Sequence, residues 1–104
     1  MLETSIKVGE REIKLKPSHK AIFAIERESG LAVYDLCVGH NLKILEVVSI
    51  LFNCAEAAGE KIKRDELAEM LMGNISPEII LKCDELLNSV FADPSEDDKK
   101  KAEQ

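Results

Sequence analysis

The segment from Leu42 to Ala58 constrains the fold of this chain more than any other. On a helical projection at about 100° per residue, its polar side chains fall within about 80° of one another, and the rest of its circumference is aliphatic. These polar residues are Glu46, Ser49, Asn53 and Glu56. A helix of this kind is surrounded by protein on nearly every side. We therefore predict that it forms the central core helix.

The composition is typical of one soluble globular domain with an aliphatic core. The chain has 104 residues, of which 45% are hydrophobic and 33% are charged. A chain of this length can bury roughly two-thirds of its unfolded surface, which permits a core without metals or disulfides. Only 4% of the residues are aromatic, and none is Trp. We expect an aliphatic core and few platforms on which nucleic acid bases could stack.

The charge balance and the cysteines indicate a cytoplasmic protein that does not bind nucleic acid. A net charge of −6 disfavours binding to a phosphate backbone. Cys37, Cys54 and Cys83 are odd in number and lie among aliphatic neighbours, so we predict reduced thiols in a reducing compartment. The first ten residues do not read as a signal peptide, and no apolar run is long enough to span a bilayer. We expect no membrane association.

Alternating apolar residues predict an N-terminal β-hairpin. Gly9 is the first residue of a two-residue loop and can take the positive φ of a type II′ turn, which pairs Val8 with Arg11. That register places four apolar side chains on one face: Ile6, Val8, Ile13 and Leu15. A lone hairpin is marginally stable in water. This face must therefore pack on helices or on the strands of a neighbouring subunit.

The stretch AIERESGLAVYDL, residues 24–36, predicts a helix that stops and a second that starts at once. Ser18 suits the N-cap of a first helix that runs to about Ser29. Gly30 can adopt the left-handed conformation that closes a helix. A short helix over about residues 33–38 follows. The glycine thus separates two helices that are almost contiguous in the sequence.

Two further helices are predicted after a stop at Gly59. The first is short and covers about residues 64–72. The second begins at Ser76, where serine can cap, Pro77 suits the first helical position, and Glu78 favours the positive end of the helix dipole. Its apolar residues recur at helical spacing along a wide seam: Ile79, Ile80, Cys83, Leu86, Leu87, Val90 and Phe91.

These elements predict an α+β fold that is mainly α. An N-terminal β-hairpin is followed by about five helices, three longer and two short, around an aliphatic core. Residues 1–92 form a single domain. Residues 93–104 have no large apolar side chain to bury, so we predict a disordered charged tail.

No pattern in the sequence predicts catalysis, a cofactor or a metal. Cys37 and His40 have a Cys-x-x-His spacing, and Cys54 and Cys83 would complete a zinc site. No second closely spaced pair exists, however, and these two cysteines fit the seams of their helices. Cys37 also lacks the electropositive, partly exposed setting of a catalytic thiol. The glycines are separate helix stops rather than a phosphate loop. We expect that the protein is not an enzyme.

Charged residues near the end of the first helix are predicted to lie in solvent. Glu26 and Glu28 are two positions apart and point to different faces, which makes them a poor carboxylate pair. Glu28 is expected to point outward together with Lys20 and Arg27. The charged cluster at residues 61–66 is predicted to form a solvated link and the start of a helix.

Apolar surface is the remaining candidate for function. Two helices have wide apolar seams and the hairpin has an aliphatic face. Either these apolar surfaces pack against one another, or part of the apolar surface remains exposed and binds a partner. The hairpin edge offers one route to a homo-oligomer. The candidate partner-binding residues are Ile79, Leu86, Leu87, Val90 and Phe91.

The order of elements resembles a known family. The segment IKVGEREIKLKPSHKAIFAIERESGLAVYDL is a short hairpin, a helix that ends in acidic residues, a glycine and a small apolar restart. It is similar to the phage and gene transfer agent tail assembly chaperone family, which is also labelled a tail tube family. The likeness covers about residues 4–92 and includes a long apolar helix that ends in Ala57-Ala58-Gly59. Order and spacing carry it rather than any single motif.

The resemblance implies a non-enzymatic assembly factor of a prophage or gene transfer agent. Such a protein would bind and shield the long apolar tape measure protein before the tail tube polymerises around it, and other tail proteins are further partners. The resemblance implies no catalytic residues for this chain. It implies that Gly30 and Gly59 are structural residues that end helices. Two alternatives remain open: a structural tail component retained in the particle, and a generic cytoplasmic helical protein-interaction module.

Overall fold

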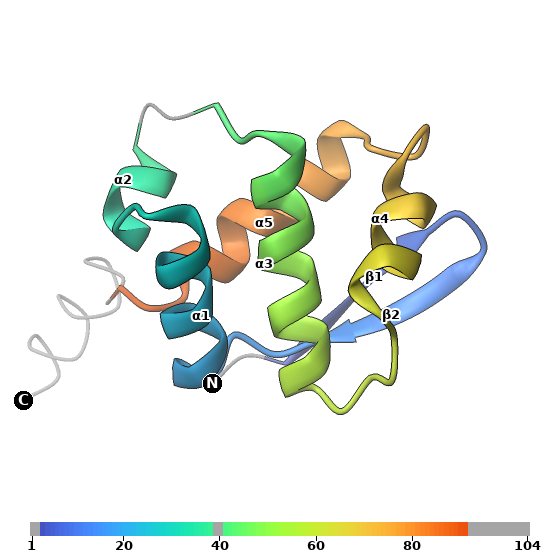
Figure 1. Cartoon of the computed structure of the whole chain (residues 1–104), viewed down its shortest axis with the longest axis horizontal. Helices are drawn as coiled ribbons and strands as arrows, with labels where there is room; N and C mark the ends of the chain where they lie inside the picture. The colour runs from blue at the N-terminus through green and yellow to red at the C-terminus, as the bar shows by residue number, and fades with distance from the viewer. Residues whose placement is uncertain (1–2, 39–40, 92–104) are drawn as a thin grey trace, which may run out of the picture.

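The computed structural model describes residues 3–38 and 41–91 of the chain (Figure 1). Over these residues the elements are β1 (Thr4–Val8), β2 (Arg11–Leu15), α1 (His19–Ser29), α2 (Val33–Cys37), α3 (Ile44–Ala57), α4 (Arg64–Leu71) and α5 (Pro77–Asn88). The fold is therefore α+β and mainly α, with an antiparallel hairpin before five helices, as the sequence predicted. The predicted tail, residues 93–104, lies outside the described residues.

The strands β1 and β2 form the predicted hairpin in the predicted register. Val8 pairs with Arg11. Gly9 has φ 63°, and no non-glycine residue in the described ranges has a positive φ, so Glu10 does not supply the second positive φ of a type I′ turn. The apolar face is buried through Ile6, Val8, Ile13 and Leu15. It packs on the helices, mainly through β2 against α3, which confirms a helical partner for this face.

The helix α3 is the central helix of the fold. It packs against α1, β2, α4 and α5, and Figure 1 shows it in the middle of the molecule with α5 crossing behind it. Its buried residues include Glu46, Ser49 and Asn53 as well as aliphatic side chains, whereas Glu56 is exposed. The prediction of a core helix is confirmed. Most of its polar stripe is also covered by protein.

The junction between α1 and α2 is held by residues on both sides of Gly30. Ser18 caps α1, its Oγ accepting from the backbone N–H of Ala21 at 3.2 Å. Gly30 has φ 72° and donates its N–H to the carbonyl of Glu26 at 2.9 Å. The carboxylate of Glu26 then accepts from the backbone N–H of Val33 at 2.9 Å. Glu26 thus links the end of α1 to the first turn of α2.

Replacing Gly30 with alanine is expected to lower the free energy of unfolding by about 1 kcal/mol, because a side chain rarely adopts its left-handed conformation. No heavy atom lies within 4 Å of the added Cβ, so the cost is conformational and not a clash. Urea unfolding measures it. The control Lys20→Ala, at an exposed position of α1, should shift stability by no more than about 0.5 kcal/mol. Equal stability of the two variants would contradict this role of Gly30.

The ends of α3 and α5 are set by different interactions. Gly59, with φ 90°, follows α3; its N–H donates to the carbonyl of Glu56, and that of Glu60 donates to the carbonyl of Ala55, each at 3.0 Å. This is the hydrogen-bond pattern of a Schellman motif. The helix α5 ends at Asn88, earlier than the predicted seam at Phe91.

The early end of α5 has a local cause. Ser89 Oγ donates to the carbonyl of Leu86 at 2.6 Å, and the next two backbone N–H groups bond to carbonyls three residues back. A serine hydroxyl that competes for a backbone carbonyl disfavours continuation of an α-helix. Val90 and Phe91 therefore leave the helical seam.

Candidate functional site

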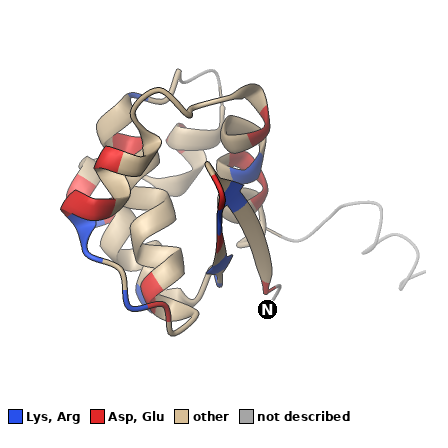
Figure 2. Cartoon of the chain, turned by 90° about the vertical axis from the view of Figure 1, so that its right-hand side faces the viewer, with Lys and Arg blue, Asp and Glu red and all other residues tan. Residues whose placement is uncertain are grey.

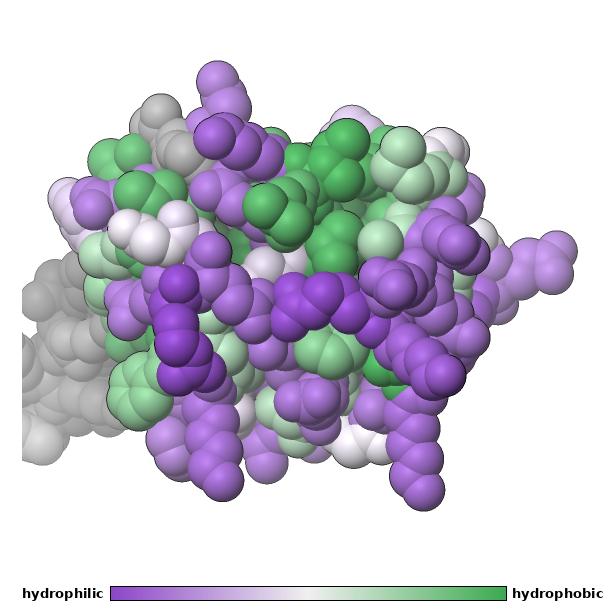
Figure 3. Space-filling model, in the orientation of Figure 1, coloured by the Kyte–Doolittle hydropathy of each residue, from purple (hydrophilic) through white to green (hydrophobic). Residues whose placement is uncertain are grey.

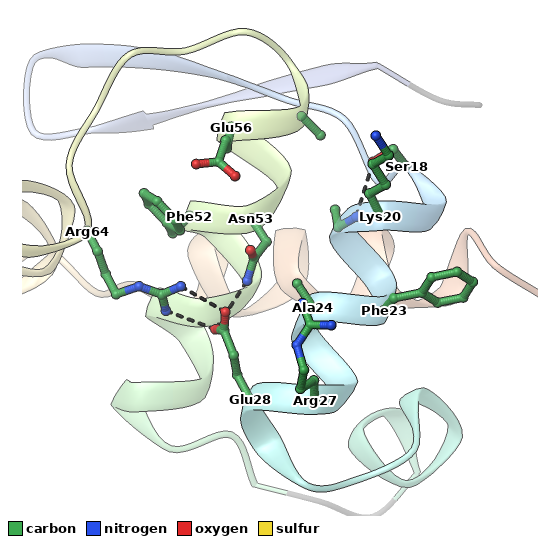
Figure 4. A pocket seen from close by; sticks show the side chains of 12 residues that line it. Ser18, Lys20, Phe23, Ala24, Arg27, Glu28, Phe52, Asn53, Glu56 and Arg64 are labelled. Carbon is green, nitrogen blue, oxygen red and sulfur yellow. Dashed lines mark hydrogen bonds and ion pairs between the residues drawn. The ribbon is translucent and has the colours of Figure 1, made fainter.

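A polar network joins α1, α3 and α4 on one face of the core (Figure 4). Arg64, the first residue of α4, donates from two guanidinium nitrogens to the two carboxylate oxygens of Glu28, each at 2.9 Å. Ser49 Oγ donates to Glu28 Oε1 at 2.6 Å, and Asn53 Nδ2 donates to the same oxygen at 3.2 Å. One carboxylate from α1 therefore binds side chains from two other helices.

This placement corrects the prediction for Glu28 and for the charged link. Glu28 was expected to point outward, and Arg64 was expected to lie in a solvated segment. Their side chains are 31% and 39% exposed and bond to each other. Ser49 and Asn53, one turn apart on α3, are only 4% and 7% exposed and need acceptors. The last turn of α1 lies over them and supplies the carboxylate.

The network is electrostatically favourable. Burial by itself would raise the pKa of Glu28, but hydrogen bonds from Arg64 and Ser49 and the attraction of the guanidinium outweigh it. The pKa of Glu28 therefore lies below its ordinary value. The guanidinium also lies 4.5 Å from the centre of the Phe52 ring, a distance at which a cation is attracted to an aromatic face.

Two open clefts lie beside the network. One has a volume of about 610 Å³, between α1 and α3, and its walls include Phe52, Asn53 and Glu56. The other has a volume of about 470 Å³ and includes Leu45 from the first turn of α3. Glu28 and Arg64 belong to the walls of both clefts, so their ion pair stands between the two.

The polar side chains of this site form hydrogen bonds with one another. Over residues 3–38 and 41–91, no buried side-chain nitrogen or oxygen lacks a hydrogen-bond partner. Asn53 also donates from Nδ2 to the carbonyl of Ser49 at 2.8 Å. In the same ranges, no group of three or more His, Cys, Asp or Glu side chains is placed to hold a metal ion. The hydrogen bonds of the network fix α1, α3 and α4 relative to one another.

The thiols lie mainly in the core. Burial raises the pKa of Cys54 to about 12, and burial, with smaller contributions from neighbouring groups, does the same for Cys83. Both are therefore protonated near neutral pH and poor nucleophiles. Cys37 is half-buried, and burial, followed by repulsion from Asp84, raises the pKa of its thiol. His40, the other half of the Cys-x-x-His spacing, lies outside the described residues.

Several large apolar side chains remain on the surface. They come from α1, α2, α3 and α5 and from the segments that follow α2, α4 and α5: Phe23, Tyr34, Val38, Ile44, Leu45, Met72, Leu81, Val90 and Phe91. Figure 3 shows hydrophobic surface gathered over the first turn of α3, where Ile44 and Leu45 lie.

A second apolar group lies where α2 meets the end of α5, and we call it the α2–α5 patch, formed by Tyr34, Val90 and Phe91. The Tyr34 and Phe91 rings pack edge to face with their centres 6.2 Å apart. They are nevertheless 61% and 43% exposed. This patch joins residues that are far apart in the sequence, so the periodicity of the last helix predicted Val90 and Phe91 but not Tyr34.

The structure divides the predicted partner-binding residues into two groups. Ile79, Leu86 and Leu87 are buried in the core, because α5 lies against α3 and this part of its seam fills the space between them. Val90 and Phe91 lie after the helix and are accessible. A partner of the folded chain can therefore reach the last two but not the first three. Sequence reasoning missed Tyr34, which lies beside Phe91.

The fold and the site define a small α+β, mainly helical protein with a satisfied interhelical polar network and exposed aromatic side chains. None of the helices in the described ranges combines the length and the apolar character needed to cross a bilayer. Comparisons with protein-family models, curated proteins and solved structures found no match.

Proposed function

We propose that this protein is a non-enzymatic, cytoplasmic assembly factor that binds and shields a tape measure protein during assembly of a phage or gene transfer agent tail. The proposal joins the sequence resemblance to the distribution of apolar side chains. It assigns no covalent chemistry to any residue. Its mechanism is reversible burial of apolar surface on a client polypeptide.

The placement of the aromatic residues carries the proposal. The chain has four aromatic residues of the Phe and Tyr types, and none belongs to the fully buried core. Phe23, Tyr34 and Phe91 are exposed, and Phe52 is only partly buried beneath Arg64. Aromatic side chains bury the most area when they enter a core and are enriched at the energetic centres of interfaces. Their exposure favours a protein that binds another protein.

The α2–α5 patch is the part of this surface that best suits a helical client. Tyr34 and Phe91 present two rings that already contact each other, and Val90, which precedes Phe91 in the chain, is also exposed. An amphipathic helix places apolar anchors at i, i+3, i+4 and i+7 into a groove or patch of this kind. A tape measure protein is long and apolar, so many copies of the patch could cover successive seams of one client.

Phe91→Asp is expected to reduce the soluble fraction of a coexpressed cognate tape measure protein several-fold relative to the unmodified chain. A charge at this position opposes burial of the patch against an apolar client. The fold should remain intact, because Phe91 is exposed and lies outside α5. Circular dichroism and thermal unfolding of the purified variant check the fold, and soluble client is quantified after centrifugation.

The matched control is Leu81→Asp, which introduces the same charge at an exposed apolar residue within α5. It should leave the soluble client unchanged. If the unmodified chain fails to keep the client soluble, the proposed function is wrong. If both variants reduce solubility equally, the α2–α5 patch is not the binding surface. Retention of the protein in purified particles would favour the structural tail component instead.

A further inference from the structure

The two outer edges of the hairpin differ in their hydrogen bonding. On β2, the backbone N–H of Lys14 donates to Glu60 Oε2 at 2.7 Å, and that of Lys16 donates to the carbonyl of Cys54 at 2.9 Å. These two outward N–H groups are therefore occupied. At Lys14 and Lys16, the outer edge of β2 is covered by α3 and by the loop that follows it.

The outer edge of β1 is open. Val8 and Arg11 close the hairpin as a hydrogen-bonded pair, so the backbone groups of Ser5 and Lys7 point away from β2. Neither residue has a partner for these groups among residues 3–38 and 41–91. An unpaired strand edge is a template for pairing with another strand. Figure 2 shows the hairpin from the side, with residues of both charges along it.

We propose that β1 pairs antiparallel with β1 of a second copy of this chain, about a two-fold axis at Ser5. The two hairpins then form one four-stranded sheet. Ser5 lies opposite Ser5 of the second copy, and Glu3 lies opposite Lys7 in both directions. Each of these residue pairs would exchange two backbone hydrogen bonds, because all three residues present outward-facing backbone groups.

The charges on the exposed face of β1 complement themselves in this register. Glu3 and Lys7 are both exposed and have opposite charge, so the two-fold axis places a carboxylate opposite an ammonium group twice. Lys7 already lies opposite Glu12 within the hairpin. The same hairpin register continued by one residue sets Glu3 opposite Lys16. Across the joined sheet the charges then alternate from Glu12 to Lys7, Glu3 and Lys16.

Other pairing registers give less favourable pairs of side chains across the two β1 strands. An axis at Lys7 would put two ammonium groups opposite each other, which is destabilising. An axis at Ile6 would place Lys7 opposite Ser5 and would move Glu3 opposite Gly9, inside the turn. A strand of another protein would need a matching charge order, whereas a second copy supplies it by symmetry. A second copy is therefore the occupant that the residues favour.

A charge-swap experiment tests this pairing with the full chain in low salt, by analytical ultracentrifugation over a wide range of concentrations. The unmodified chain should reach the mass of two chains. Glu3→Lys and Lys7→Glu should each weaken self-association about tenfold or more, because each sets like charges opposite each other twice. An equimolar mixture of the two variants should restore a dimer, because a lysine of one variant then lies opposite a glutamate of the other at both facing pairs.

Two further variants complete the test. Lys14→Glu makes the same change of charge on β2, away from the proposed interface, and should leave association unchanged. Ser5→Pro removes an outward N–H that has no partner among the described residues, so it should weaken the dimer. At concentrations low enough for both chains to be monomeric, its thermal unfolding should stay close to that of the unmodified chain. A chain that is monomeric throughout overturns the proposal. So does a dimer that neither Glu3→Lys nor Ser5→Pro affects. The result does not depend on the client of the proposed function.

Discussion

Replacing Leu87 with alanine is expected to lower the free energy of unfolding by about 2–5 kcal/mol. The side chain is fully buried, and its removal loses both the transfer free energy of the deleted atoms and the contacts around the resulting cavity. A small domain has a total stability of only about 5–15 kcal/mol, so this is a large fraction of it. Urea unfolding at neutral pH, followed by circular dichroism, measures the change from the shift in midpoint.

The matched control is Leu81→Ala on the same helix. Leu81 is 61% exposed, so the same truncation should change stability by no more than about 0.5 kcal/mol. The pair of variants also separates the core from the accessible surface of α5. A loss below about 1 kcal/mol for Leu87→Ala would mean that this part of the seam is not packed in the core.

The elements of the fold were predictable because their signals are local. The register of the hairpin follows from Gly9 and the alternation beside it, and the caps at Ser18 and Ser76 bond to N–H groups three residues away. Gly30 follows the acidic end of α1, and this position predicted the left-handed conformation that the residue adopts. Interactions of this range can be inferred from short stretches of sequence.

The site was not predictable, because its contacts join distant segments. Glu28 and Arg64 are 36 positions apart, and each reads as a solvated charge in its own neighbourhood. Nothing local indicates which turn of α1 will cover Ser49 and Asn53. The available signal was that these two residues lie one turn apart on the narrow polar stripe of a largely aliphatic helix. Buried polar groups of this kind require partners from another element.

The seam of α5 is a second case in which local sequence signals were not sufficient. Its periodicity predicted an amphipathic helix correctly, yet it could not tell which seam residues meet the core and which meet solvent. That division depends on where α3 lies and on where Ser89 ends the helix. The position of Tyr34 beside Phe91 depends on the packing of α2 on α5, which no local pattern encodes.

Glu28→Ala is expected to lower the free energy of unfolding by about 1–3 kcal/mol, because Ser49 and Asn53 lose an acceptor within the protein and Arg64 loses its ion pair. Water reaches about a third of the Glu28 side chain, which screens the charge and limits the effect. Urea unfolding measures it. Glu56→Ala, at an exposed carboxylate of α3 without these bonds, is the control and should change stability by no more than about 0.5 kcal/mol.

The pH dependence identifies the charge as the cause. The pKa of Glu28 is lowered in the folded chain, so its ionised form stabilises the fold above its unfolded pKa, and this contribution is lost as the pH falls through the lower folded pKa. The stability difference between the unmodified chain and Glu28→Gln should therefore be constant near neutral pH and shrink below about pH 4.5. Other carboxylates titrate in both proteins and largely cancel in this difference. A difference that stays the same at low pH would show that Glu28 acts through packing rather than through its ionised carboxylate.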